Sequence, residues 1–171
     1  MTERAMIDIE TLGTEPGCVI VSIGAVRFDL EHGVTDSLFV SVDPESCQAL
    51  GMEIDAGTLA WWLGQPAEAR EQLTGGDDLE IALRELRAFV DGAEEVWANS
   101  PSFDLAILDE AFDAVGLSSP WEFWEQRDYR TLRETLPYWP GRDQQGTKHD
   151  ALDDARYQAE CLVEALREVE R

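Results

Sequence analysis

The sequence predicts a single mixed α/β domain over residues 1–171. Three segments rich in β-branched residues come first, and segments with helical spacing alternate with one short apolar segment after them. Elements in this order pack as layers around one core. With 171 residues, of which 44% are hydrophobic, the chain is long enough for such a core and too apolar to stay disordered.

The first part of the chain is expected to form an antiparallel meander. Residues 5–10 and 19–28 have the composition of strands, and the turn sequence GTEPG separates them. A third strand is expected at 37–42, after the His-Gly turn at 32–33. Short turns between consecutive strands favour antiparallel pairing.

Helices dominate the rest of the sequence. The apolar residues of 79–90 recur at the spacing of one helix face. The other expected elements are a helix over 55–73 broken near Gly64 and Pro66, a buried strand at 95–98, a helix over 103–115, a loop around 137–141 and a final helix ending near residue 169.

The net charge is strongly negative. The chain has 36 acidic residues against 13 Lys and Arg, a formal charge of −23, and Lys148 is its one lysine. Such a surface repels itself unless salt shortens the Debye length, and halophilic proteins share this composition; an ordinary acidic protein is the alternative. Nucleic-acid-binding proteins usually carry basic patches. The composition therefore argues against nucleic-acid binding unless bound metal ions supply positive charge.

Sequence features of export and membrane insertion are not found. The start MTERAMIDIE lacks the basic and apolar regions of a signal peptide, and no apolar run approaches the roughly 18 residues of a membrane span. Cys18, Cys47 and Cys161 are widely spaced, as expected of reduced thiols. We expect a cytoplasmic protein of a halophilic cell or its virus, with no membrane partner.

Two acidic residues share one face of the first strand. Side chains alternate along a strand, so Asp8 and Glu10 project to the same side about 7 Å apart, while Ala5, Ile7 and Ile9 face the core. Neighbouring carboxylates repel each other unless they are exposed, protonated or bridged by a cation. Taken alone, the pair is also compatible with a solvated strand face.

Further candidates lie at the starts of two helices. Asp104 follows the 95–98 strand and its loop, where ligands of α/β sheets gather, although an isolated Asp there also complements the helix dipole. In the final helix Asp154 borders the apolar face and can point toward the sheet, whereas Asp153 falls on the opposite, solvated side. His149 lies at the junction with the preceding loop, where its imidazole can reach a site.

In the order DxE, D and HxxxxD, these residues form a specific pattern. The motifs are IDIETLG at 7–13, GCVIVSIGAVRFD at 17–29, ANSPSFDLAIL at 98–108 and HDALDDA at 149–155. They resemble the DEDDh (DnaQ-like) 3′–5′ exonucleases of the ribonuclease H-like superfamily, and most closely the RNase AS and exonuclease VIII-like group. The resemblance runs from Met6 to about Val169 and implies a ribonuclease H-like fold, a mixed five-stranded sheet flanked by helices.

The resemblance also implies a role for each matching residue. Asp8, Glu10, Asp104 and Asp154 match metal ligands, His149 matches the general base, and Thr11 and Leu12 match positions that contact the 3′-terminal nucleotide. Oxygen ligands suit two Mg²⁺ or Mn²⁺ ions. Phe103 and the Trp61-Trp62 pair are candidates for base stacking, with core packing as the alternative.

The implied activity is metal-dependent 3′–5′ exonucleolytic hydrolysis of single-stranded nucleic acid. RNA is favoured over DNA as the substrate, and nucleoside 5′-monophosphates are the expected products of two-metal-ion catalysis. The alternatives are a DNA exonuclease of the proofreading or recombination type and a catalytically silent binding module. Relatives of this group are often dimers, so a homodimer belongs to the expectation.

Overall fold

The computed structural model describes residues 2–141, 143–144, 146 and 149–169, and its centre is a five-stranded sheet in the order β3-β2-β1-β4-β5. The first three strands pair antiparallel, whereas β4 runs parallel to β1 and β5 runs parallel to β4. The strands are β1 (Arg4–Thr11), β2 (Ile20–Asp29), β3 (Gly33–Ser41), β4 (Glu95–Ala98) and β5 (Gln126–Asp128). The expected mixed sheet and its antiparallel meander are confirmed.

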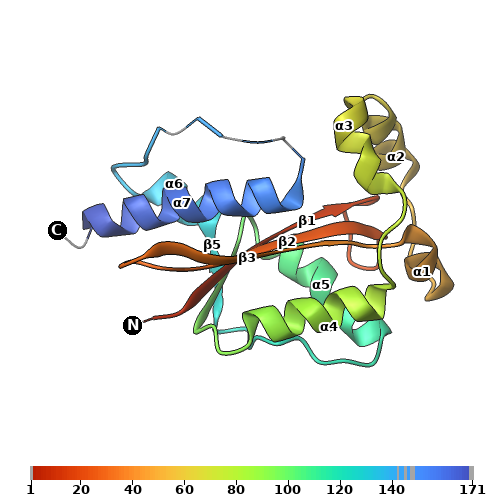
Figure 1. Cartoon of the computed structure of the whole chain (residues 1–171), viewed down its shortest axis with the longest axis horizontal. Coiled ribbons are helices and arrows are strands. Elements are labelled where there is room, and N and C mark those ends of the chain that lie inside the picture. Colours follow the sequence, from red (N-terminus) through yellow and green to blue (C-terminus); the bar gives the residue numbers. More distant parts are fainter. Residues whose placement is uncertain (1, 142, 145, 147–148, 170–171) are drawn as a thin grey trace.

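Helices cover both faces of the sheet. The long helix α7 packs on one face with α6 beside it, while α4 and α5 pack on the other (Figure 1). The helices are α1 (Pro44–Ala49), α2 (Ala56–Leu63), α3 (Ala67–Arg70) with a 3₁₀ turn at Glu71–Leu73, α4 (Leu79–Val90), α5 (Asp104–Ala114), α6 (Tyr129–Thr135) and α7 (Ala151–Val169).

Most element bounds agree with the sequence patterns, and three elements were missed. The helical region 55–73 breaks after Gly64, as expected. The short elements α1, β5 and α6 were not predicted, because each is held by local caps or by pairing rather than by an apolar repeat. Asp128, for example, ends β5 and accepts the Arg130 N–H at 3.0 Å, which caps α6.

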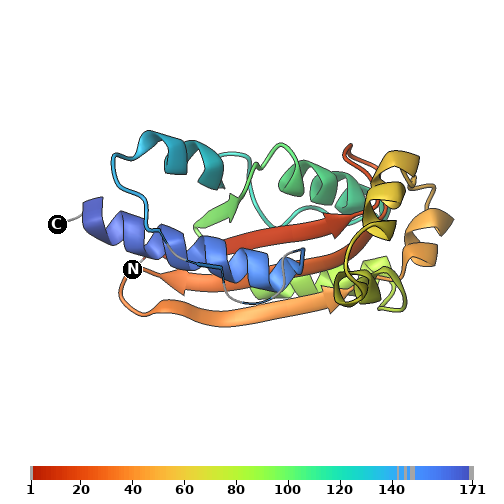
Figure 2. The same cartoon turned by 90° about the horizontal axis from the view of Figure 1, so that it is seen from above.

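Strict alternation along β1 divides its side chains between two apolar clusters. Ala5, Ile7 and Ile9 are buried on the α4–α5 side, whereas Met6 is buried against α7. Asp8 and Glu10 must therefore lie on the α7 face, in line with Met6. Figure 2 shows α7 running across β1 and β2 on this face.

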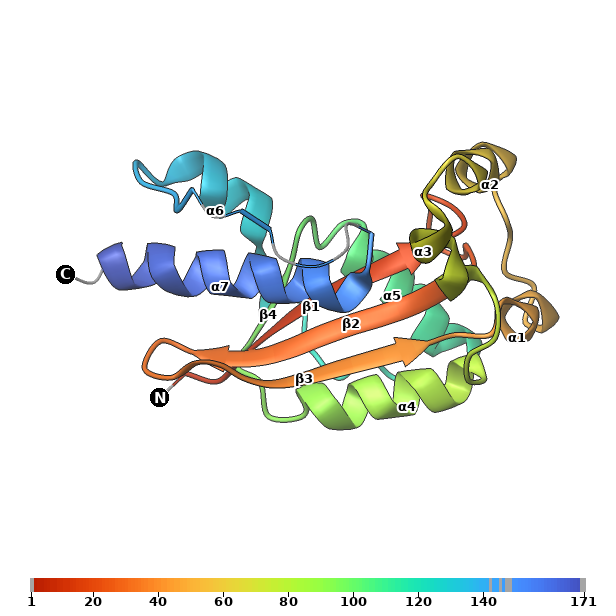
Figure 3. The ribbon, with the colours of Figure 1, turned by 45° about the horizontal axis from the view of Figure 1, so that its top comes forward.

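A glycine lets α7 lie directly on the sheet. Gly24 pairs with Asp8 across β1 and β2, and a Cβ atom at Gly24 would stand only 2.1 Å from the carbonyl carbon of Ala151. Asp150 caps this first turn, since its carboxylate accepts the N–H groups of Leu152 and Asp153 at 3.1 and 3.0 Å. The start of α7 thus lies beside the acidic strand (Figure 3).

Among the described residues, none of the helices combines the length and the apolar composition needed to cross a bilayer.

Candidate active site

The fold brings the four predicted carboxylates together at one end of the sheet. Asp8 and Glu10 come from β1, Asp104 is the first residue of α5, and Asp154 lies in the first turn of α7. The Ile9 N–H donates to Asp104 Oδ1 at 3.3 Å, which connects the start of α5 to β1 near the C-terminal end of the strand. Asp104 is only 3% exposed. It is therefore not the solvated residue that would be expected if it only complemented the helix dipole.

Burial raises the pKa of every member of this carboxylate cluster, and repulsion by the other members adds to the rise at Asp8 and Glu10. Burial raises the pKa of Asp8 well above its usual range, with further contributions from Asp104, Glu10 and Asp154. Burial raises the pKa of Glu10 to about 8, and the Asp154 and Asp104 charges add to it. The pKa of Asp104 rises to about 7 through burial, against the lowering effect of the Ile9 N–H. Burial likewise raises the pKa of Asp154.

Raised pKa values of this kind are expected where the negative charge of the carboxylates is balanced by a bound cation and not by a side chain of the protein. Glu10, Asp154 and His149 each offer a ligand atom, and all three atoms lie within 4.8 Å of one another. A carboxylate-dominated donor set suits hard divalent cations such as Mg²⁺ and Mn²⁺. A bound cation would favour the charged form of these buried carboxylates and would offset the repulsion at Asp8 and Glu10. The residues present therefore fit a divalent metal site.

His149 lies two residues before the start of α7, and its side chain reaches the carboxylate cluster. Its backbone has a φ of 64°, a left-handed conformation that residues with a Cβ seldom adopt. Its ring meets Trp61 at a centroid distance of 4.8 Å. His149 and the four predicted metal ligands thus converge on one place, as the motif order suggested.

A cavity of about 410 Å³ opens beside Glu10. Its lining comprises Glu10, Thr11, Gly13, Thr14, Asp55, Gly57, Thr58, Trp61, Trp62 and Phe103. Four predicted substrate contacts belong to this lining: Thr11, Phe103, Trp61 and Trp62. Leu12 does not: it is 5% exposed and packs in the hydrophobic core. The Thr11 hydroxyl donates to the Gly13 carbonyl at 2.6 Å, so it holds the turn after β1.

Two glutamines contact the site and were not singled out from the sequence. The amide of Gln158 donates to Asp8 Oδ1 at 2.9 Å, and the amide of Gln72 donates to the backbone carbonyl of His149. Gln158 follows Asp154 by one helical turn, so its position on the sheet-facing side of α7 could have been read from spacing. No sequence pattern links Gln72 to His149, which is 77 residues away.

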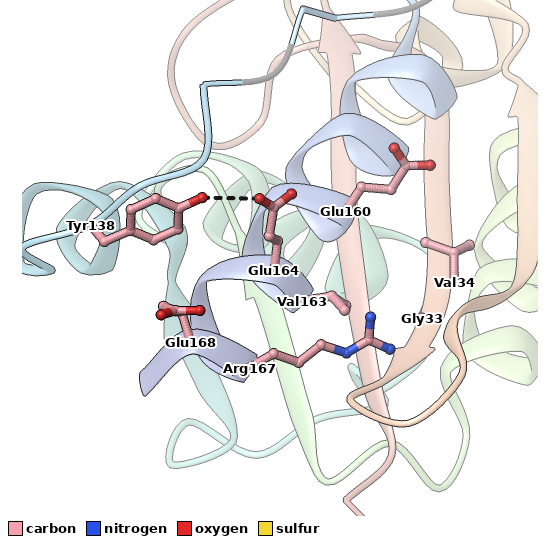
Figure 4. A pocket seen from close by; sticks show the side chains of 8 residues that line it. All are labelled: Gly33, Val34, Tyr138, Glu160, Val163, Glu164, Arg167 and Glu168. Atoms are coloured by element: carbon pink, nitrogen blue, oxygen red, sulfur yellow. Dashed lines mark hydrogen bonds between the residues drawn. The ribbon is translucent and has the colours of Figure 1, made fainter. Parts of the chain in front are cut away.

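A larger cavity, of about 550 Å³, lies elsewhere, toward the C-terminal half of α7. Glu160, Glu164, Arg167 and Glu168 line it, and the Tyr138 hydroxyl donates to Glu164 at 3.0 Å (Figure 4). None of the carboxylate cluster borders this cavity. Size alone therefore does not identify the site, whereas the converging acidic groups do.

Comparison with known proteins places this geometry in context. Residues 3–166 match the model of a family described as a 3′-5′ exoribonuclease Rv2179c-like domain. An exodeoxyribonuclease of Enterobacteria phage T4 is 24% identical in an alignment 161 residues long; the match covers 77% of this chain and 70% of the phage protein.

Solved structures share the fold at low sequence identity. E. coli exonuclease I in complex with a dT13 oligonucleotide matches with a TM-score of 0.71 and 17% identity, over 98% of this chain and 41% of that one. The nuclease domain of 3′hExo, a DEDDh family member bound to rAMP, matches with a TM-score of 0.64 and 16% identity, over 97% and 92% of the two chains. This chain thus spans about two fifths of exonuclease I. The ribonuclease H-like fold and the DEDDh resemblance expected from the motifs are confirmed.

Proposed function

This chain belongs to the family of Rv2179c-like 3′–5′ exoribonuclease domains, and on that premise we propose that it removes nucleotides from the 3′ ends of single-stranded nucleic acid, preferring RNA. The observation that carries the proposal is the convergence of Asp8, Glu10, Asp104 and Asp154, all with raised pKa values, beside His149. A solvated acidic patch would not raise the pKa of its carboxylates in this way.

The four carboxylates would hold two Mg²⁺ or Mn²⁺ ions, which when bound supply positive charge at the scissile phosphate and Lewis acidity toward water and the leaving 3′-oxygen. His149, at the edge of the carboxylate cluster, accepts the proton of the attacking water as general base. Gln158 orients Asp8 through its amide hydrogen bond of 2.9 Å. Attack on the last phosphodiester bond releases a nucleoside 5′-monophosphate.

The 410 Å³ cavity beside Glu10 is the proposed seat of the 3′-terminal nucleoside. Phe103 offers an aromatic surface to a base there, and Thr11 shapes the wall next to the carboxylates. Leu12 supports this wall from the core side. Positive charge for the backbone would come from the cations and from Arg130, an exposed side chain whose charge acts to lower the pKa of Asp104.

RNA is preferred because the family is described as exoribonucleolytic, and because the similar 3′hExo nuclease domain was solved with rAMP. DNA is the second candidate. It is favoured by the phage T4 relative, named an exodeoxyribonuclease, and by the exonuclease I complex with a dT13 oligonucleotide. The hydrolytic chemistry is the same for both substrates, so only their relative rates separate the two.

The test uses 5′-labelled RNA and DNA oligonucleotides of one sequence, incubated with the protein in high salt and Mn²⁺ or Mg²⁺. A ladder that shortens from the 3′ end, faster on RNA and abolished by EDTA, is the expected result. Asp104→Asn should give no ladder, while Asp113→Asn, which removes the same charge from an exposed position of α5, should behave like the native chain. Metal-dependent binding without any released nucleotide would instead support a silent binding module.

A further inference from the structure

The segment between β3 and α4 contacts His149 at two separate points. Trp61 of α2 meets its ring, and Gln72 of the 3₁₀ turn meets its backbone. Each contact joins two residues that are more than seventy positions apart in the sequence. Both contacts come from outside α7, and they add to the approach of His149 to Asp154 in the first turn of that helix.

The ring contact is edge to face. The Trp61 and His149 centroids are 4.8 Å apart with planes at 90°, a favourable geometry for aromatic pairs. Trp61 is 44% exposed, so burial alone does not account for its position. Its contacts are instead aromatic on both sides, since Trp62 stands 5.1 Å away at 78°.

Trp62 fixes this aromatic pair to the acidic strand. It is 1% exposed, and its indole N–H donates to the Thr11 carbonyl at 2.9 Å. Thr11 directly follows Glu10, so the anchor of α2 lies one residue from a predicted metal ligand. A chain of contacts therefore runs from Thr11, next to Glu10, through the two tryptophans to the ring of His149.

Gln72 holds the main chain of His149. Its amide donates to the His149 carbonyl and to the Ala69 carbonyl, and its side-chain oxygen accepts the buried Ser22 hydroxyl at 2.7 Å. Every polar atom of the Gln72 side chain is thus engaged. The left-handed backbone of His149, with its φ of 64°, persists only where surrounding contacts determine it.

We propose that Trp61 and Gln72 are positioning residues that hold His149 in place as general base. Trp61 fixes the plane of the imidazole and Gln72 fixes the peptide that carries it. The inference rests on the proposed exonuclease function and adds a role for the 56–73 segment. This segment completes the active site by holding both the ring and the main chain of His149.

The experiment is a double-mutant cycle. Single-turnover rates and KM for 5′-labelled RNA are measured for the native chain, Trp61→Ala, His149→Ala and the double variant, with Leu63→Ala as a control at a more exposed position of the same helix. We expect Trp61→Ala to lower the rate about 10- to 100-fold with little change in KM, the usual effect of misplacing a catalytic group. In the His149→Ala background the same change should cost less than about 2-fold, because its effect passes through His149. Gln72→Met should follow the same pattern, and Trp61→Phe should keep most of the rate.

Equal losses in both backgrounds, or a rise in KM alone, would overturn the inference and assign Trp61 to base stacking. A native rate in His149→Ala would overturn the base role and this inference with it, whereas a native chain that releases no nucleotide would mean that the proposed function fails. A readout independent of activity separates the two further: the chain has two histidines, so the His149 ring protons can be followed by NMR beside those of His32. Trp61→Ala should move the His149 resonances and leave those of His32 in place; unmoved His149 resonances in the folded variant would contradict the contact.

Discussion

Gly24→Ala tests whether the close approach of α7 to the sheet assembles the site. The added Cβ would stand 2.1 Å from the Ala151 carbonyl carbon, whereas ordinary contacts begin at 3.4 Å, so the first turn of α7 must retreat by about 1.3 Å. Asp154 and His149 move with that turn, while Asp8 stays on β1. Metal–oxygen bonds of roughly 2.0–2.2 Å do not tolerate such a shift. We expect kcat/KM to fall about 10²-fold, Mn²⁺ affinity to fall at least about 10-fold, and stability to fall by about 1–3 kcal/mol from overpacking.

Mn²⁺ binding by calorimetry and nucleotide release are the two assays. Gly141→Ala is the matched control, because a Cβ there meets nothing within 4 Å. It reports the effect of losing a glycine from the unfolded chain, which can by itself add about 0.4–1 kcal/mol of stability. Native metal affinity and turnover in folded Gly24→Ala would refute the idea that α7 must lie this close.

Four other perturbations probe the site and the charge. Asp104→Asn should abolish turnover while the thermal midpoint of the metal-free protein holds or rises at pH 8, because one repelling charge is gone. His149→Ala should lower kcat about 10²–10⁴-fold at neutral pH with an unchanged circular dichroism spectrum. The metal-free protein should lose stability as pH rises from 4.5 toward about 8, the window set by Glu10. With a net charge of −23, the melting temperature should rise with added KCl.

The sign of the pH effect follows from proton binding. Between its ordinary pKa of 4.5 and its folded value of about 8, Glu10 holds more proton in the folded chain than in the unfolded one. The contribution of Glu10 to stability is therefore fully present below 4.5 and is lost as pH rises through about 8. Saturating Mn²⁺ should reverse this trend. A flat pH profile without metal, native activity in either active-site variant, or full stability in dilute buffer would each contradict the corresponding expectation.

Much of the fold could be predicted, because a strand or helix that is buried on one face has a strongly periodic pattern of apolar residues. The alternation of β1 and the apolar stripe over 79–90 both report which face is covered. The β5 strand could not be found this way, since its three residues, Gln126–Asp128, are polar and partly exposed, and it is a strand only because β4 pairs with it. The third strand begins at Gly33, four residues before its apolar part, because β2 pairs with it as far as the turn.

The acidic part of the site was predictable, and its supporting contacts were not. Helical phase was enough to choose Asp154 over Asp153, and strand alternation was enough to place Asp8 with Glu10. The contact of Trp61 with His149, by contrast, depends on how the broken helical region folds back over the end of β1. The spacing of residues within that region does not predict this long-range contact.

The most direct test of the central claim is a Mn²⁺ titration in which bound ions and released 5′-nucleotide are measured in the same samples. Turnover on single-stranded RNA should rise as two ions per chain bind, and both signals should be lost in Asp104→Asn. Nucleotide release that does not depend on bound Mn²⁺, or Mn²⁺ binding that Asp104→Asn leaves intact, would contradict a hydrolytic metal site in the carboxylate cluster.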